Sequence, residues 1–172
     1  MEEKACNELI HEAVKIPRIN QLLKSLGTNK PNWQGIAIDC RRCSTDGVEG
    51  NARAMLSENP LGVTICVNRV HDIGEISSSL THELTHAYDF LQNRYDFNTC
   101  HGLASSEIRA AREAECNSYT KSELFPYFRN ECIKQHAERS TANLYPSKEA
   151  KECVKTVFNK AMADLEPNPI RD

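Results

Sequence analysis

The sequence predicts an α+β fold that is mostly helical and contains a small mixed sheet. Apolar residues recur at steps of three and four in several long segments, which is the period of a helix. Between residues 61 and 67 apolar residues instead stand at every second position, which is the period of a strand. A His-Glu-x-x-His motif at residues 82–86, within one of the helical segments, narrows the fold class further.

These periods and their stop signals place the elements in chain order. Helices are expected over residues 3–15, 18–27, 74–93, 105–123, 126–140 and 147–164. Pro17 separates the first two of these helices, and Gly27 is a stop signal for the second. Strands are expected over 34–40 and 61–67, with a polar loop or irregular hairpin over 44–60 between them.

The motif places two imidazoles, His82 and His86, four positions apart with the carboxylate of Glu83 beside the first. On a helix, positions four apart lie on one face a turn apart, so both rings can reach the same metal ion. Glu83 would then stand close enough to contact a water on that ion without binding the ion itself. Two histidine ligands, a general base and an open position are the zincin arrangement of Zn²⁺.

The surrounding residues support this interpretation. One apolar helix stripe is formed by Ile73, Ile76, Leu80, Leu84, Ala87 and Leu91. The opposite stripe is polar and consists of His82, His86, Asp89 and Asn93. Histidines that only filled a core would more naturally lie on the apolar side, so the pattern favours a metal site.

A catalytic zinc site needs a third protein ligand downstream. Asp89 and Gln92 stand where a metzincin would continue with Gly and His, which excludes that class. Asp89 lies on the same straight helix as the histidines, so we expect it to support a ligand or the fold instead of binding zinc. Glu107 is the best candidate, since it begins a second helix whose small residues would allow a close approach.

The alternatives for these roles stay open at this point. Glu107 could simply complement a helix dipole from the first turn, with Ser105 or Ser106 as N-cap. Other possible third ligands are His101, Asp96 and Glu113. A side chain that helps to polarise the substrate carbonyl could be Tyr88, Tyr95, Tyr119 or His101. The strand over 61–67 is expected to border the cleft and to pair with an extended substrate, unless it is an ordinary buried strand.

Several segments together resemble the mitochondrial inner-membrane zinc metalloproteases that also assist ATP synthase assembly, a family that includes the Ku-binding protein of animals. The resemblance is carried by the segments 82–89, Tyr95-Asp-Phe-Asn98, Ser106-Glu-Ile-Arg-Ala-Ala111 and Glu115-Cys116, in the family's order and spacing. It extends more weakly to Cys40-Arg-Arg-Cys43, to 63–68 and to the tail 157–167. Two departures are Ser105, where the family usually has Cys, and His101-Gly102-Leu103, where many members have further histidines.

The resemblance implies a zinc-dependent endopeptidase of the mitochondrial intermembrane space, peripherally attached to the inner membrane. Its polypeptide substrate would be the ATP synthase membrane subunit a or its precursor. His82 and His86 match the family's ligands, Glu83 its catalytic carboxylate and Glu107 an acidic residue of its Ser-Glu-Ile-Arg segment. The fold implied is zincin-like and, with Glu107 as a ligand, gluzincin-type. The alternative is an assembly chaperone or an adaptor protein with a structural zinc site, in which proteolysis is dispensable.

Length and charge agree with one compact domain over residues 1–172. Within it we expect an N-terminal helical arm over 1–30, a catalytic core over 34–123 and a C-terminal helical extension over 126–172. The net charge of −3 and the lack of a long basic run argue against nucleic-acid binding. The longest uncharged apolar-leaning stretch, 59–68, is far shorter than a membrane span, and the acidic start lacks a presequence, so membrane contact would be peripheral.

The chain contains eight cysteines, distributed over its whole length. An even and high count favours disulfide bonds in an oxidising compartment. Reduced core thiols and a second metal site are the alternatives; Cys40-x-x-Cys43 could be half of a zinc knuckle, although no second close pair completes it. The sequence does not decide how the cysteines pair.

Overall fold

The computed structural model describes residues 1–27, 35–46, 50–118 and 126–167. It is mostly helical with one small mixed sheet, as the predicted α+β class requires. The chain forms two compact units, the first unit Met1–Tyr88 and the second unit Asp89–Asp172, and the boundary falls within helix α3 (Ile73–Leu91). The expected single domain and its subdivision stay a prediction.

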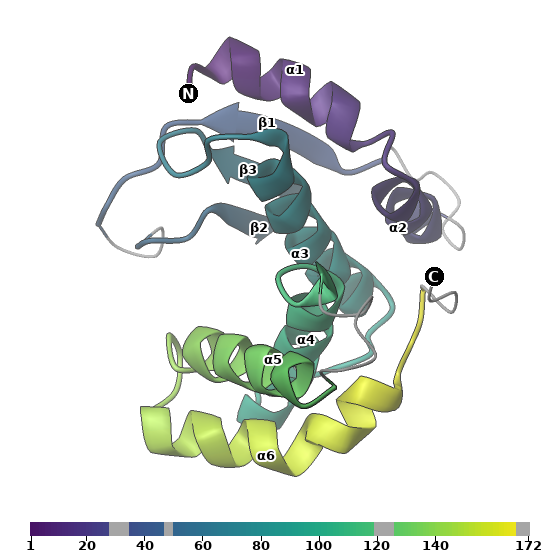
Figure 1. Cartoon of the computed structure of the whole chain (residues 1–172), viewed down its shortest axis with the longest axis vertical. Helices are drawn as coiled ribbons and strands as arrows, with labels where there is room; N and C mark the ends of the chain where they lie inside the picture. The colour runs from purple at the N-terminus through teal and green to yellow at the C-terminus, as the bar shows by residue number, and fades with distance from the viewer. Residues whose placement is uncertain (28–34, 47–49, 119–125, 168–172) are drawn as a thin grey trace. The chain divides into compact units, whose positions relative to one another are not determined.

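The first unit begins with two amphipathic helices, α1 (Glu3–Ala13) and α2 (Pro17–Gly27). Both confirm the predicted segments to within a few residues. Proline opens α2 because the first helical position needs no backbone N–H. Each helix buries one stripe at the helical period: Cys6, Ile10 and Ala13 from α1, and Ile19, Leu22 and Leu26 from α2. Helix α1 lies alongside β1 (Ala37–Arg41), as Figure 1 shows.

The sheet has the strand order β1-β3-β2, with β2 at Ala54–Glu58 and β3 at Leu61–Cys66. Strand β3 is parallel to β1 and antiparallel to β2. The strands predicted over 34–40 and 61–67 are confirmed at Ala37–Arg41 and Leu61–Cys66, although residue 34 lies outside the described residues. A polar loop or an irregular hairpin was expected over 44–60. Of the described residues in that range, Ala54–Glu58 form β2, which makes an antiparallel hairpin with β3. The turn at Asn59-Pro60 joins β2 to β3. Strand β2 was not predicted because Ala54–Glu58 lacks a clear alternation of apolar and polar residues.

The central position of β3 corrects a second expectation. Both edges of β3 carry hydrogen-bonded neighbours, so this strand cannot pair with a substrate backbone. Val63, Ile65 and Cys66 are buried, as expected for the middle strand of a covered sheet. The alternation of apolar residues predicted a buried strand, but such a pattern cannot show whether one edge of the strand is free to pair.

Helix α3 was predicted at 74–93 and is found at Ile73–Leu91. It starts at a capping arrangement, in which the carboxylate of Asp72 accepts from the backbone N–H of Glu75 (2.9 Å) and that of Glu75 accepts from the N–H of His71 (2.8 Å). After its last turn Asn93 adopts a left-handed conformation (φ 50°), which asparagine tolerates better than most residues.

The second unit packs α4 (Cys100–Glu113) against α5 (Pro126–Thr141) and α6 (Ser147–Ala163), as Figure 1 shows. Predicted helices 126–140 and 147–164 are confirmed. The helix predicted over 105–123 is shifted at both ends. It begins at Cys100 behind the N-cap Thr99, whose hydroxyl accepts from the N–H of Gly102, and it ends at Glu113. Residues 119–123 of that prediction lie outside the described residues. The core of this unit is apolar and includes Ala104, Ile108, Ile133, Val154 and Phe158.

All eight cysteines are paired, which confirms the disulfide prediction. The bonds are Cys6–Cys40 and Cys43–Cys66 in the first unit, and Cys100–Cys153 and Cys116–Cys132 in the second. They tie α1 to β1, the segment after β1 to the end of β3, α4 to α6, and the turn after α4 to α5. Each such bond typically contributes ~2–4 kcal/mol to stability.

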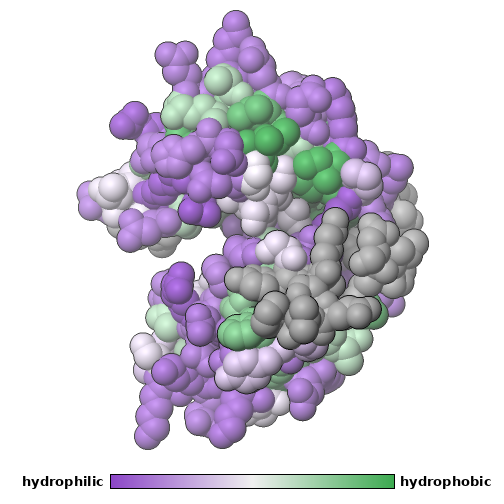
Figure 2. All heavy atoms as spheres, in the orientation of Figure 1, coloured by the Kyte–Doolittle hydropathy of each residue, from purple (hydrophilic) through white to green (hydrophobic). Residues whose placement is uncertain are grey.

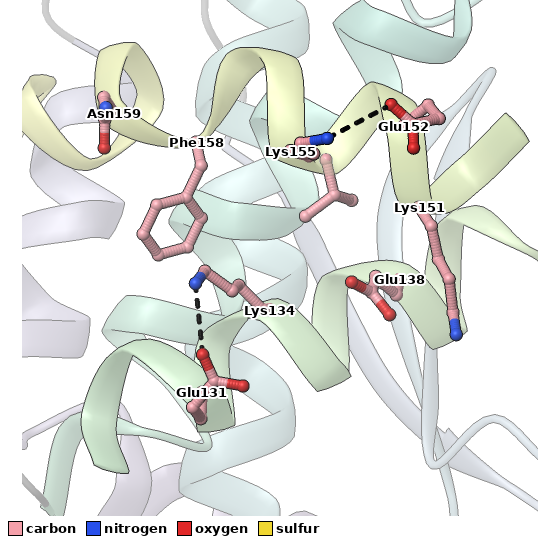
Figure 3. A pocket seen from close by; sticks show the side chains of 9 residues that line it. Glu131, Lys134, Glu138, Lys151, Glu152, Lys155, Phe158 and Asn159 are labelled. Carbon is pink, nitrogen blue, oxygen red and sulfur yellow. Dashed lines mark hydrogen bonds and ion pairs between the residues drawn. The ribbon is translucent and has the colours of Figure 1, made fainter. Parts of the chain in front are cut away.

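On the face seen in Figure 2, the described residues are largely hydrophilic, with small hydrophobic patches. Among the described residues, no helix combines the length and the apolar character that crossing a bilayer demands. A groove between α5 and α6 has a volume of about 380 Å³ and is lined mainly by charged side chains (Figure 3). Two ion pairs form within single helices, Lys134 with Glu131 in α5 and Lys155 with Glu152 in α6, which suits a solvated groove between the helices.

Candidate metal centre

His82 and His86 lie one turn apart on α3 and direct the same ring atom toward each other. Their Nε2 atoms are 3.0 Å apart, and the ring centroids are separated by 4.7 Å at an interplanar angle of 75°. His86 is buried, while His82 and Glu83 are half-buried. The helix therefore brings the two predicted ligands together, and Glu83, which follows His82 directly, lies beside them on the helix surface.

This spacing fits a bound Zn²⁺. Tetrahedral coordination at the usual zinc–nitrogen distance puts two ligand nitrogens about 3.3 Å apart. The observed 3.0 Å is close to that value, so a small rotation of the rings suffices. The donors are borderline-soft imidazole nitrogens, which suit Zn²⁺ better than a hard cation such as Mg²⁺.

The rest of α3 explains why the histidines are held in place. Ile76, Leu80, Leu84 and Ala87 are fully buried and anchor the helix, as the apolar stripe predicted. Ile73 departs from that prediction, since it is 40% exposed at the first turn. On the polar side, the hydroxyl of Thr81 donates to the carbonyl of Ser77 and that of Thr85 to the carbonyl of Thr81, so these hydroxyls are satisfied within the helix.

Glu107 belongs to the second unit and lies in the middle of α4, where it is buried. The interpretation of Glu107 as a first-turn residue is therefore wrong, because the helix begins seven residues earlier, at Cys100. Ser105 and Ser106 are correspondingly not N-caps. Ser105 donates to the carbonyl of His101, and Ser106 donates to a carboxylate oxygen of Asp89 at 2.8 Å.

Asp89 is fully buried and joins the end of α3 to α4. Its carboxylate accepts from Ser106 and from the guanidinium of Arg109, at 3.2 Å from Nε and 3.0 Å from Nη2. Ser106 and Arg109 flank Glu107 in the sequence. Within the second unit, Asp89 thus holds the last residues of α3 against the part of α4 that carries Glu107.

Arg109 also binds the chain that leaves α6. Its Nη1 contacts the Asp164 carboxylate at 2.7 Å, and its guanidinium donates to the carbonyls of Asp164 and Glu166. One turn along α4, Arg112 donates to the carbonyls of Ala161 and Met162, at 3.1 Å each. The carbonyl of Ala161 also accepts from the N–H of the C-cap residue Asp164, at 3.3 Å. The last carbonyls of a helix lack the usual partners four residues on, so the two buried arginines help to satisfy the end of α6 and the chain that follows it.

Asp164 lies in a charged cluster of the second unit together with Arg94, Tyr95, Arg109 and Glu166, and these groups shift one another's pKa. Burial alone would raise the pKa of Asp164, but hydrogen bonds from Arg94 and Tyr95 and the charges of Arg109 and Arg94 lower it to about 2. Burial and the hydrogen bond to Asp164 raise the pKa of Tyr95 to about 12. For Arg94, burial lowers the pKa, but its bonds to Asp164 and Glu166 outweigh burial and raise it above its usual range.

The other residues considered from the sequence occupy different places. His101 is exposed at the start of α4, and Asp96 is exposed before it. Glu113 is buried and bound to Arg112 at 2.6 Å. The hydroxyl of Tyr95 donates to Asp164 at 2.8 Å, so it belongs to the charged cluster of the second unit. Tyr88 is buried in α3, and Tyr119 lies outside the described residues.

Sequence reasoning missed Arg109, Arg112 and Asp164. The available signal was Arg109-Ala-Ala-Arg112, two charged residues within a helix whose neighbouring positions are small and apolar. Arginines at such buried positions need partners. Arg109 pairs with Asp89 and Arg112 with Glu113, but their partners at the end of α6 lie more than forty residues away in the chain, beyond the reach of a local pattern.

A helix that presents two converging imidazoles and an adjacent carboxylate is the site expected of a metallopeptidase. The chain belongs to the peptidase M76 family, whose model matches residues 3–169.

Curated relatives support this assignment. One from Debaryomyces hansenii, named mitochondrial inner membrane protease ATP23, is 34% identical over 115 residues, which cover 62% of this chain and 49% of that protein. The protein of the same name from Meyerozyma guilliermondii is 31% identical over 88% of this chain and 64% of its own length. The human homolog is 30% identical over 86% of this chain and 67% of its own length.

The matched region spans about half to two thirds of these relatives. No solved structure matches the chain. The comparisons therefore establish a peptidase family, whose named relatives are mitochondrial inner membrane proteases.

Proposed function

We propose that this protein is a zinc-dependent endopeptidase of zincin-like, gluzincin-type fold. The observation that carries the proposal is the convergence of His82 and His86 at 3.0 Å, with Glu83 beside them on α3. Membership of a peptidase family supports it. A purely structural zinc site would not need a carboxylate next to its ligands.

Glu107 is the third ligand in this proposal. A carboxylate from a second helix is needed, because a third ligand on α3 itself could hardly complete a tetrahedron. The hydrogen bonds of Asp89 to Ser106 and Arg109 support the choice, since they fix α4 on both sides of Glu107 to the turn that follows His86. In this proposal Asp89 does not bind the metal ion but supports the site indirectly, by holding α4 in place.

The residues of the chain divide the chemistry between them. When bound, zinc supplies a Lewis acid that polarises the peptide carbonyl and brings the pKa of a water ligand to ~7. His82 and His86 hold the ion as neutral imidazoles. Glu83 accepts the proton of the attacking water and then donates it to the nitrogen of the leaving amine.

The location and substrate are part of the same proposal. We place the protein in the mitochondrial intermembrane space, attached peripherally to the inner membrane. Its substrate there is a polypeptide, the membrane subunit a of ATP synthase or its precursor, which it would process and help to assemble. The location is supported by the relatives, which are named mitochondrial inner membrane proteases. Four disulfide bonds suit an oxidising compartment.

Glu83→Gln should separate metal binding from catalysis. Because the amide cannot accept the proton of water, peptide cleavage should fall by at least ~100-fold while zinc content stays at one ion per chain. The measurements are zinc content and cleavage of an unstructured polypeptide by the purified protein. Glu149→Gln, at an exposed first-turn position of α6, is the matched control and should cleave normally. Equal cleavage by wild type and Glu83→Gln would contradict the mechanism.

Glu107→Gln should weaken metal binding itself. An amide replaces a charged ligand, so we expect zinc affinity to fall at least ~10-fold, with cleavage recovering in part at high zinc. Competition with a fluorescent chelator measures the affinity, and Glu149→Gln again serves as the control. If Glu107→Gln retains wild-type affinity, another residue is the third ligand.

A further inference from the structure

Cys132 differs from the other seven cysteines in its exposure. Those seven are buried, whereas Cys132 is half-buried at the surface of α5. Its bond to Cys116 links α5 to the turn after α4. A reducing thiol must reach a sulfur atom in order to open a disulfide, so we expect the bond of the most exposed cysteine to be opened first.

His136 stands next to the same bond. It follows Cys132 by four positions on α5, so both side chains project from one face of the helix. The two sulfur atoms and a ring nitrogen of His136 all lie within 4.8 Å of one another. His136 is half-buried, as Cys132 is, so the cluster is open on one side.

We propose that the Cys116–Cys132 disulfide is a redox-controlled metal site. When the bond is opened, the two thiolates and the imidazole of His136 bind one thiophilic divalent cation such as Zn²⁺. When the bond is closed, no thiolate is available and the site does not exist. The proposal is independent of the candidate metal centre on α3.

The geometry suits such an ion without movement of the helices. Around a tetrahedral zinc, two thiolates stand about 3.8 Å apart and a thiolate and an imidazole nitrogen about 3.6 Å apart. The cluster already lies within 4.8 Å, so side-chain rotations alone can adjust these distances. Residues around it are packed: Cys116 belongs to the apolar core of the second unit, and Cys132 packs against that core.

The chemistry needs an external reductant of the thiol class. A thiolate attacks Sγ of Cys132 and forms a mixed disulfide, which releases Cys116 as a thiolate. A second thiol of the reductant then attacks that mixed disulfide, so Cys132 is freed and the reductant leaves as its own disulfide. Two electrons and two protons have passed to the protein. The incoming cation displaces the two thiol protons.

The test uses the full chain with His86→Ala, which removes the first metal centre and keeps the two proposals distinguishable. One equivalent of a water-soluble phosphine is added, and free thiols are alkylated and mapped by mass spectrometry. Cys116 and Cys132 should be labelled before the other six cysteines. The reduced protein should then take up about one Co²⁺ or Zn²⁺ per chain, with a thiolate-to-cobalt absorption band that the oxidised protein lacks.

A matched pair of histidine variants completes the test. In the reduced His86→Ala chain, His136→Ala should lower the affinity for Zn²⁺ at least ~10-fold, whereas His101→Ala, at an exposed position of α4, should leave it unchanged. The proposal is overturned if another disulfide opens first, if no ion is taken up, or if His136→Ala binds as tightly. Loss of the helical circular dichroism on opening this one bond would overturn it too, because the site requires α4 and α5 to keep their places.

Discussion

Asp164 is the residue on which the charged cluster of the second unit depends. It accepts from Arg94 at 2.6 Å and from Tyr95 at 2.8 Å, and it pairs with the buried Arg109 at 2.7 Å. A buried ion pair is poor evidence of stability by itself, since desolvation offsets much of the attraction. Removing one partner is costly, however, because it leaves the other charge buried and uncompensated.

Asp164→Asn should make stability less dependent on acid pH. The pKa of Asp164 is lowered to about 2, so its carboxylate stabilises the fold fully above its unfolded value near 4 and loses that effect as the pH falls through about 2. We expect the variant to be less stable by ~2 kcal/mol at neutral pH. Urea unfolding at pH 7, 4 and 2 measures the difference.

The gap between wild type and Asp164→Asn should narrow toward pH 2. Asp46→Asn, at an exposed position after β1, is a control that should show no such gap. A gap that stays constant between pH 7 and pH 2 would show that the charge of Asp164 is not what stabilises the fold.

The sequence could predict residues whose chemistry is local, and it could not predict those whose partners are distant. His82, Glu83 and His86 share one helix turn, so their spacing alone indicated that both rings face one ion. Asp89 was expected to support the site, but its partners Ser106 and Arg109 follow only from the packing of α4.

Among the elements, α4 is the one that the sequence placed least well. Ser105 and Ser106 looked like caps because serine favours that position, yet Thr99 caps the helix and the serines lie inside it. Ala104, Ile108 and Ala111 are fully buried, as is Arg109 on another side of the helix. A helix that is buried all round has no polar stripe from which its start could be read.

Gly102 fixes how α4 begins. A Cβ at this position would stand 2.0 Å from the carbonyl oxygen of Asp96 and 2.9 Å from the hydroxyl of Thr99. The first of these neighbours is backbone and cannot move aside cheaply. The glycine therefore lets the preceding turn approach the helix closely enough for Thr99 to cap it.

Gly102→Ala should destabilise the protein, although alanine is normally the better helix former. We expect a loss of ~1–3 kcal/mol, because the clash outweighs the gain in helix propensity. Thermal unfolding measures the change. Gly74→Ala, in the first turn of α3, is the matched control, since its Cβ would meet only a side-chain oxygen of Asp72 at 3.1 Å. Equal stabilities of the two variants would contradict the close approach.

At the scale of the whole molecule, each unit has its own core and its own pair of disulfides. Composition predicted the bonds, because eight cysteines in a chain of 172 residues exceed what a reducing compartment favours. The pairing could not be predicted, since it depends on which elements become neighbours, such as α4 and α6.

Replacing Cys100 and Cys153 together by serine should loosen the second unit alone. Loss of a bond that closes a 53-residue loop should lower its unfolding free energy by ~4 kcal/mol. Hydrogen exchange followed by mass spectrometry should show faster exchange in α4, α5 and α6, with unchanged protection in β1 and β3. The double variant of Cys43 and Cys66 should give the reverse pattern. Uniform acceleration over the whole chain in either variant would contradict separate cores.

The order of the bonds along the chain also bears on how the polypeptide matures. The first two bridges are complete by Cys66, and the other two use cysteines from Cys100 onward. A chain threaded amino end first through a membrane could thus lock its leading half while the trailing half is still on the far side. No disulfide joins the two halves, so the bonds of the first half could form before the second half arrives, and none would have to be reduced again.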